Sequence, residues 1–234
     1  MRRVVWHAIL SLPAFAFAQS GPAPGADFHA RIQWTQQPEK IHHAPPAVVW
    51  LNPVDKRLEV HSASPGHFTL LQKNRTFLPH VLVIPLGSVV SFPNADPFFH
   101  NVFSLFNGKR FDLGLYEAGA SKEVVFSREG VSYIFCDIHP EMSAVILTLS
   151  TPLYGIADSF EKVSVRNVPA GEYTLHVWVE GLTQQALDGM VRRVQVRAGA
   201  SDSITLDATN ALREPAQHLN KFGQPYDRPA SAPY

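Results

Sequence analysis

Residues 136–142 read Cys-Asp-Ile-His-Pro-Glu-Met and hold the only cysteine of the chain, followed by a histidine and a methionine at successive three-residue steps. Methionine occurs only three times in the 234 residues, and one copy is Met1. Far upstream, residues 92–104 read FPNADPFFHNVFS and supply a second histidine. The two stretches together offer one thiolate, two imidazoles and one thioether, on Cys136, His100, His139 and Met142.

This donor set is typical of a site for one copper ion that alternates between Cu(I) and Cu(II). Sulfur suits Cu(I), imidazole suits either state, and a weak axial thioether adjusts the potential. Cys136 ends one predicted strand and Met142 precedes the next, so that the loop brings three donors together. Two alternatives stay open. Glu141 is an alternative axial ligand, and zinc could occupy a site of one cysteine and two histidines.

The first 18 residues have the parts of a secretory signal peptide. Residues 1–3 (MRR) are positive, residues 4–15 are largely apolar, and residues 16–18 (AFA) match the A-x-A cleavage pattern. The apolar part is too short to cross a bilayer. We therefore expect a soluble mature chain that is exported to the periplasm.

Export makes the single cysteine informative. In an oxidising compartment cysteines usually pair as disulfides, so an unpaired one calls for an explanation. Cys136 could bridge two chains, could be an inert buried thiol, or could bind a metal. The histidine and methionine at fixed offsets favour the metal.

Charge excludes some classes of function. The 20 acidic and 20 basic residues balance, and no run of lysine or arginine exceeds a pair. A nucleic-acid-binding protein would carry a basic patch, and so would a protein held on an anionic membrane. We expect neither partner.

Short strands with turn residues between them predict an all-β fold. No window has a sustained helical periodicity. A first group of strands is predicted at residues 28–34, 47–51, 57–61, 67–73, 80–85, 88–93, 101–106, 122–126, 132–137 and 143–150. A second group is predicted at residues 161–165, 172–180, 191–197 and 202–207. Such a series indicates an antiparallel sandwich or barrel, followed by a second all-β segment.

Residues around the donors have their own predicted roles. Asn101, directly after His100, is either a turn residue or a hydrogen-bond partner of the cysteine loop. Asn94 and Asp96 are interpreted as turn caps rather than metal ligands. An apolar patch is predicted beside His139, built from Pro97, Phe98, Phe99 and Pro140.

Several motifs resemble the plastocyanin/amicyanin cupredoxins. They are Phe77-x-Pro79, Val83-x-Pro85-x-Gly87-x-Val89, Phe92-x-Asn94-x-Asp96, His100-Asn101-Val102 and Cys136-x-x-His139-x-x-Met142. The short cysteine-to-methionine spacing is similar to amicyanin. Together with residues 111–116 (FDLGLY), it resembles bacterial cupredoxin-like proteins labelled methylamine utilisation proteins. The resemblance implies an eight-stranded Greek-key cupredoxin sandwich in the periplasm, with copper on His100, Cys136, His139 and Met142.

A second resemblance concerns the flanks of this sandwich. Residues 168–175 (VPAGEYTL) look like a carboxypeptidase regulatory-like β-sandwich. The resulting expectation is a cupredoxin domain at 64–150 inserted into a smaller β-sandwich made of 28–60 with 151–209. A tandem arrangement is the alternative. The proline-rich tail, residues 210–234, is predicted to be disordered or loosely docked.

The function expected from these features is that of a periplasmic one-electron carrier, not an enzyme. Protein side chains fill all four copper positions, which leaves no place for a substrate. A redox partner protein would receive the electron at an exposed edge of His139, through the apolar patch. The alternative is a protein that binds and delivers copper without an electron-transfer role.

Overall fold

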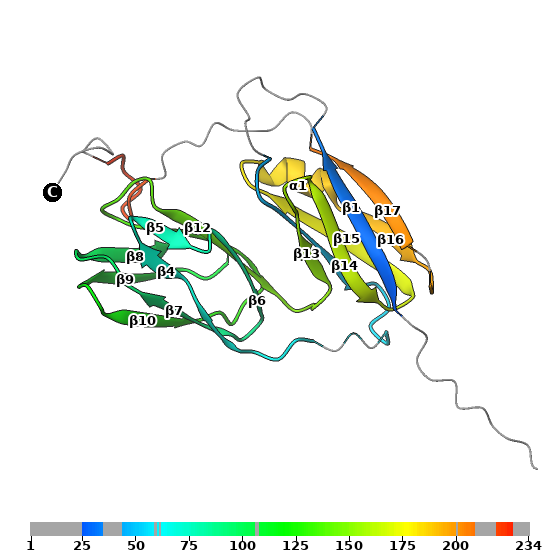
Figure 1. Cartoon of the computed structure of the whole chain (residues 1–234), viewed down its shortest axis with the longest axis horizontal. Coiled ribbons are helices and arrows are strands. Elements are labelled where there is room, and N and C mark those ends of the chain that lie inside the picture. The colour runs from blue at the N-terminus through cyan, green and yellow to red at the C-terminus, as the bar shows by residue number, and fades with distance from the viewer. Residues whose placement is uncertain are drawn as a thin grey trace, which may run out of the picture.

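The structure is a computed structural model that describes residues 25–34, 44–58, 60, 62–105, 108–199, 201–208 and 219–226. The predicted signal peptide, residues 1–18, lies outside the described residues. In the described part of the chain, no helix is both long and apolar enough to cross a bilayer. Two β-sandwiches lie side by side, with one short helix in the second (Figure 1). The predicted all-β fold with a second sandwich is confirmed.

The first sandwich consists of a five-stranded and a three-stranded sheet. The larger sheet has the order β6 (Val81–Pro85), β12 (Ser143–Leu149), β11 (Gly130–Phe135), β8 (His100–Ser104) and β9 (Phe111–Tyr116). The smaller sheet has the order β10 (Ser121–Val125), β7 (Val89–Pro93) and β3 (His67–Thr69). A hairpin of β4 (Leu71–Lys73) and β5 (Thr76–Leu78) is attached through a bridge between Gln72 and Asn94. The β12–β6 and β3–β7 pairs are parallel, and the remaining ladders of the two sheets are antiparallel.

Alternate residues of β12 face two different cores. Ala144 and Ile146 pack in the core between the two sheets of the first sandwich, together with Ile134 of β11. Val145 and Leu147 point the other way and pack in the core of the second sandwich. A strand buried on both faces needs apolar side chains at nearly every position. This explains why residues 144–149 read AVILTL without a polar alternation.

The second sandwich combines strands from both ends of the chain. One sheet has the order β14 (Lys162–Val168), β1 (Ala26–Gln33) and β17 (Ser201–Asp207). The other has the order β13 (Tyr154–Ile156), β2 (Ala47–Pro53), β15 (Gly171–Val179) and β16 (Arg192–Val196). In β1 the buried residues Ala26, Phe28, Ala30 and Ile32 alternate with more exposed ones, as expected for a strand with one buried face.

Two predictions about local structure were wrong. A helix, α1 (Gln184–Met190), connects β15 to β16 although no helical periodicity was found. It is only seven residues long, too short to show a period, and it is fixed by Thr183 accepting a hydrogen bond from the N–H of Ala186 and by burial of Leu187. The strand predicted at 57–61 is also wrong where it is described, because residues 57 and 58 lie in a turn.

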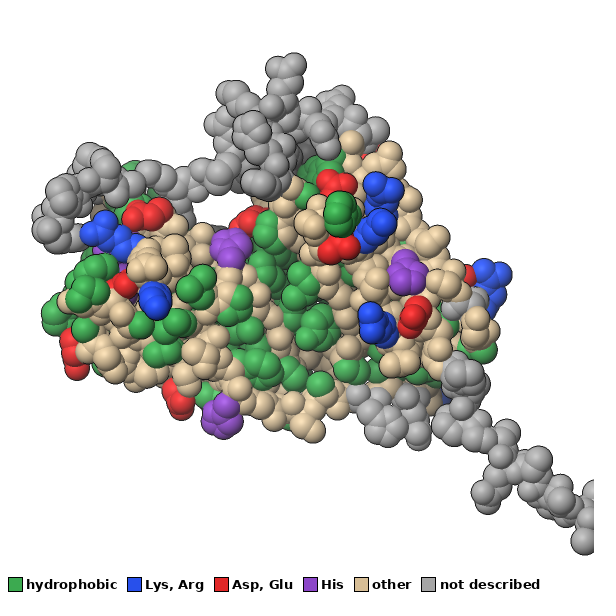
Figure 2. Space-filling model, in the orientation of Figure 1, with side chains coloured by type: hydrophobic (Ala, Val, Ile, Leu, Met, Phe, Trp, Pro, Cys, Tyr) green, Lys and Arg blue, Asp and Glu red, His purple; other side chains and the backbone are tan. Residues whose placement is uncertain are grey.

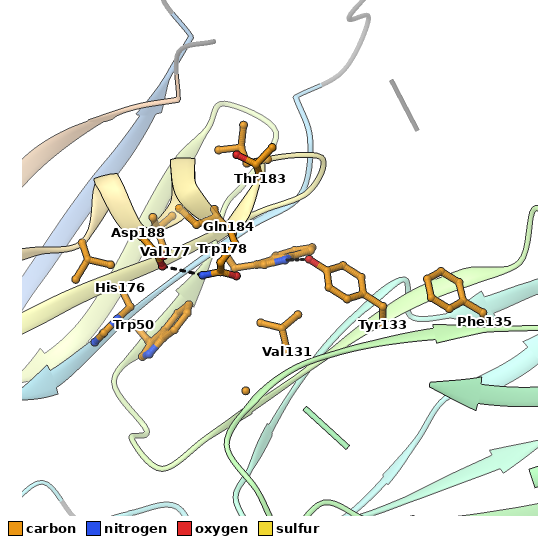
Figure 3. A pocket seen from close by; sticks show the side chains of 14 residues that line it. Trp50, Val131, Tyr133, Phe135, His176, Val177, Trp178, Thr183, Gln184 and Asp188 are labelled. Atoms are coloured by element: carbon orange, nitrogen blue, oxygen red, sulfur yellow. Dashed lines mark hydrogen bonds between the residues drawn. The ribbon is translucent and has the colours of Figure 1, made fainter. Parts of the chain in front are cut away.

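The two sandwiches meet through apolar and polar contacts, and hydrophobic side chains gather along their junction (Figure 2). The buried Trp178 of β15 donates its indole N–H to the hydroxyl of Tyr133 in β11, at 3.2 Å. Both rings line a pocket of about 750 Å³ between the sandwiches (Figure 3). At another point of the junction, His80 Nε2 lies 2.7 Å from Glu180 Oε1.

The His80–Glu180 pair is expected to make stability depend on pH. The hydrogen bond to Glu180 raises the pKa of His80 above its usual value, against the opposing effect of burial. The pair therefore stabilises the fold fully below about pH 6.5, and this contribution is lost as pH rises through the raised pKa of His80. Because the two side chains are 41% and 37% exposed, we expect less than about 1 kcal/mol. The Tm of the wild type minus that of Glu180→Gln should fall between pH 6 and 9.

Glu172→Gln is the matched control for this measurement. Glu172 pairs with Arg193 at 3.1 Å, and an arginine stays charged throughout this pH range. This variant should lower Tm by a constant amount. A wild-type-minus-Glu180→Gln difference that is equally flat across the range would contradict the prediction.

Candidate metal centre

The loop between β11 and β12 holds three of the four predicted donors. Cys136 directly follows β11 and Met142 directly precedes β12. The N–H of Met142 donates to the carbonyl of His139 at 3.0 Å, and the N–H of Cys136 donates to the carbonyl of Met142 at 3.3 Å. These bonds close the loop and bring His139 Nδ1 to 3.5 Å from Cys136 Sγ.

The remaining histidine comes from a neighbouring strand. His100 is the first residue of β8, and β8 pairs with β11 through Phe103 and Phe135. This pairing places His100 Nδ1 3.8 Å from Cys136 Sγ. One ligand atom from each of His100, Cys136 and His139 lies within 4.8 Å of the other two, and all three residues are buried. The structure thus brings together three predicted donors: His100 lies 36 positions before Cys136 in the sequence, and His139 lies 3 positions after it.

Met142 and Glu141 differ sharply in burial. Met142 is fully buried and belongs to the same core cluster as Cys136. Glu141 is exposed. Burial therefore favours the thioether over the carboxylate as a fourth donor.

The electrostatics of the site fit a cation. Burial lowers the pKa of His139 to about 4, and the charges of His100 and Arg75 add to the effect. Burial also lowers the pKa of His100, so both imidazoles are neutral at pH 7 and keep a lone pair. Burial raises the pKa of Cys136, whereas hydrogen bonds from the backbone N–H groups of Asn101, Ile138 and His139 oppose that rise. Several N–H groups directed at one sulfur stabilise a thiolate, which a bound cation would complete.

Comparison with known proteins gives structural matches only: no family model and no curated protein matches the chain. A purple cupredoxin from Nitrosopumilus maritimus is 28% identical with a TM-score of 0.32, over 35% of this chain and 98% of that one. An oxidized amicyanin variant is 14% identical with a TM-score of 0.33, over 35% and 81%. A copper-containing nitrite reductase from Thermus scotoductus is 21% identical with a TM-score of 0.34, over 50% and 28%.

The first sandwich packs a five-stranded sheet on a three-stranded sheet, with the buried His-Cys-His cluster at one end, and is cupredoxin-like in this arrangement. Its ligand loop and its His100 strand meet at one end of the larger sheet, and the cluster is consistent with one type 1 copper site.

Asp96 is a residue of the candidate metal site whose role sequence reasoning missed. As predicted, it caps a turn, because its carboxylate accepts the backbone N–H groups of Asn74 at 2.6 Å and Arg75 at 2.9 Å. The same carboxylate lies 2.9 Å from His100 Nε2. It thereby holds the ring with Nδ1 directed at the sulfur of Cys136. The spacing from Asp96 to His100 lies in an irregular loop, where no periodic pattern signals a contact.

The candidate metal site is more closed than expected on the side of Phe98. The ring of Phe98 lies 5.6 Å from that of His139 and 5.2 Å from that of His100, centroid to centroid. The guanidinium of Arg75 lies over the ring of Phe98, 5.3 Å from its centroid. His139 is only 4% exposed, so the expectation of an exposed imidazole edge was wrong. Phe99, which directly precedes His100, is 55% exposed.

Asn101 contributes through its backbone rather than its side chain. Its N–H donates to the sulfur of Cys136, which is the predicted link to the cysteine loop. Its side-chain amide donates to Asp112 Oδ1 in β9, at 2.7 Å. Asn101 therefore joins the cysteine to the edge strand of the larger sheet.

Proposed function

We propose that this chain is a type 1 copper protein that carries single electrons. The observation that carries the proposal is the buried convergence of His100, Cys136 and His139 within 4.8 Å. When bound, one copper ion would supply the exchange between Cu(I) and Cu(II). His100, Cys136, His139 and Met142 would hold it.

The protein's own contribution is a donor set that is fixed in advance. The sulfur of Cys136 already receives backbone N–H groups, and Asp96 fixes the orientation of the His100 ring. The loop hydrogen bonds between Met142, His139 and Cys136 hold the third donor. Electron transfer is favoured when the ligands move little between oxidation states, and outer hydrogen bonds of this kind provide such rigidity.

We propose that the electron leaves through an apolar surface formed by Pro97, Phe98, Phe99 and Pro140. Phe99 and Pro97 are exposed, while Phe98 and Pro140 are half-buried. Phe98 contacts both imidazole rings and so joins the surface to the site. A redox partner protein would dock here over a small area, as in other short-lived redox encounters.

The proposal includes a periplasmic setting and an inserted domain. The leader pattern of residues 1–18 supports export. Pairing of β1 with β14 and β17, and of β2 with β13 and β15, supports a cupredoxin domain at 64–150 within a sandwich of 28–60 and 151–209. We assign no enzymatic activity to either part.

Copper loading of the purified protein tests the proposal. With Cu(II) we expect one equivalent of copper, an intense visible absorption from the Cys136 thiolate, and a type 1 EPR signal. Loading with zinc is the matched control and should give no colour, because zinc has a filled d shell. Reversible reduction and reoxidation with copper retained supports a carrier. Loss of copper to a chelator at each cycle would favour copper delivery, and a colourless copper complex would overturn the proposal.

A further inference from the structure

The described part of the C-terminal tail lies against the metal-binding loop (orange-red in Figure 1). The hydroxyl of Tyr226 donates to the backbone carbonyl of Cys136 at 2.7 Å. The backbone N–H of Lys221 donates to Asp137 Oδ1 at 3.0 Å. Both accepting residues stand at the start of the loop 136–142. The proline-rich tail was predicted to be disordered or loosely docked, whereas residues 219–226 make specific contacts at the candidate site.

The side chain of Lys221 extends this contact towards the part of the sheet that carries His100. Its Nζ donates to Asp112 Oδ2 at 3.1 Å and lies 3.9 Å from Asp137 Oδ2. Asp112 also accepts the side-chain amide of Asn101, the residue that follows His100. Lys221 therefore links the loop that carries Cys136 to β9, and Asp112 of β9 in turn contacts Asn101 of β8, the strand that carries His100.

The segment has a closed conformation of its own. The side-chain oxygen of Asn220 accepts the N–H groups of Phe222 at 3.0 Å and Gln224 at 2.9 Å. The carbonyl of Asn220 accepts the N–H of Gly223, which has a φ of 76° that glycine adopts readily. This turn sets the spacing between Lys221 and Tyr226. The turn forms hydrogen bonds to its own backbone groups, so little free energy is needed to hold the segment against the loop 136–142.

The hydroxyl of Tyr226 is a dependable donor. The side chain is half-buried. A tyrosine hydroxyl is protonated at physiological pH and can donate, as this one does to the carbonyl of Cys136 at 2.7 Å.

We propose that residues 219–226 are a clamp that holds the metal-binding loop 136–142 closed, with Tyr226 and Lys221 as positioning residues. This inference rests on the proposed copper site for its role, but the contacts themselves need no metal. The clamp keeps the donors in place when copper is absent. It slows the opening of the loop through which copper would leave, because the carbonyl of Cys136 and the carboxylate of Asp137 must first lose their partners.

Hydrogen exchange in the copper-free full-length protein tests the clamp directly. The N–H groups of Cys136 and Met142 close the loop, so their exchange reports its opening. Removing one hydroxyl with Tyr226→Phe should speed this exchange about three- to tenfold, the factor expected for one lost hydrogen bond. Tyr173→Phe is the matched control, because the Tyr173 hydroxyl donates to the carbonyl of Pro169, also at 2.7 Å, in the second sandwich. Unchanged exchange in Tyr226→Phe, or an equal increase in both variants, would overturn the clamp.

Copper release separates the clamp from the proposed function. Copper-loaded Tyr226→Phe and Lys221→Met should transfer copper to an excess chelator about three- to tenfold faster than the wild type, while Tyr173→Phe matches the wild type. If the wild type binds no copper, the proposed function fails and the exchange measurement alone decides the clamp. If it binds copper and both tail variants release it at the wild-type rate, the clamp fails and the copper site stands.

Discussion

Cys136→Ser is expected to abolish the visible absorption of the copper-loaded protein and to weaken copper retention by more than about 100-fold. Loss of an outer hydrogen-bond partner of a ligand alone costs about 10- to 100-fold in affinity, and here a ligand itself is removed. A serine hydroxyl remains protonated at neutral pH and cannot supply the thiolate that the absorption requires. Visible spectra and competition with a copper chelator measure the two effects.

The fold should survive this change. Serine is close to cysteine in size, and its hydroxyl can accept the backbone N–H groups that face the sulfur of Cys136. Far-UV circular dichroism of the variant should therefore match the wild type. His176→Asn is the control variant, since His176 stacks on Trp50 in the second sandwich, with ring centroids 5.3 Å apart, and should leave the colour intact. A coloured Cys136→Ser protein would show that the absorption comes from elsewhere.

Asp96→Asn is expected to weaken copper retention about 10- to 100-fold. The carboxylate lies 2.9 Å from His100 Nε2 and fixes which nitrogen of the ring faces the sulfur. An asparagine carries one oxygen and one amide nitrogen, so it cannot accept from His100 and from both N–H groups of Asn74 and Arg75. One buried donor would be left without a partner, and the ring would lose its fixed orientation. Chelator competition measures the retention.

Asp158→Asn provides the matched control for this variant. The Asp158 carboxylate also caps a turn, by accepting the N–H groups of Phe160 at 2.8 Å and Lys162 at 3.0 Å, but it lies in the second sandwich. We expect it to change stability and not copper retention. Equal copper retention in Asp96→Asn and the wild type would show that Asp96 serves the turn alone.

The features that could be predicted from the sequence depend on residues that lie close together in it. Cys136, His139 and Met142 share one seven-residue loop, and a loop between paired strands must bring its residues together. His100 could be named because it begins a strand directly after a crowded apolar stretch. The β-fold followed from short strands rich in branched and aromatic residues, separated by turns.

The features that could not be predicted depend on contacts between distant residues. Tyr226 and Cys136 are 90 positions apart, and nothing in a proline-rich tail indicates which carbonyl its tyrosine will reach. Asp96 satisfies a turn and a histidine at once, and the turn alone accounts for its residue type. The covered edge of His139 escaped notice because the position of the Phe98 ring is set by tertiary packing.

The two-sided burial of β12 limits how this protein can be divided. Ala144 and Ile146 pack in the core of the first sandwich. Val145 and Leu147 pack in the core of the second. The strand begins at Ser143, directly after the metal-binding loop 136–142. The first sandwich therefore cannot be separated cleanly from the second: on its own it would expose Val145 and Leu147 of β12 to water, beside the candidate metal site. A change in the packing of either sandwich would reach the donor loop through β12, the strand that both cores share.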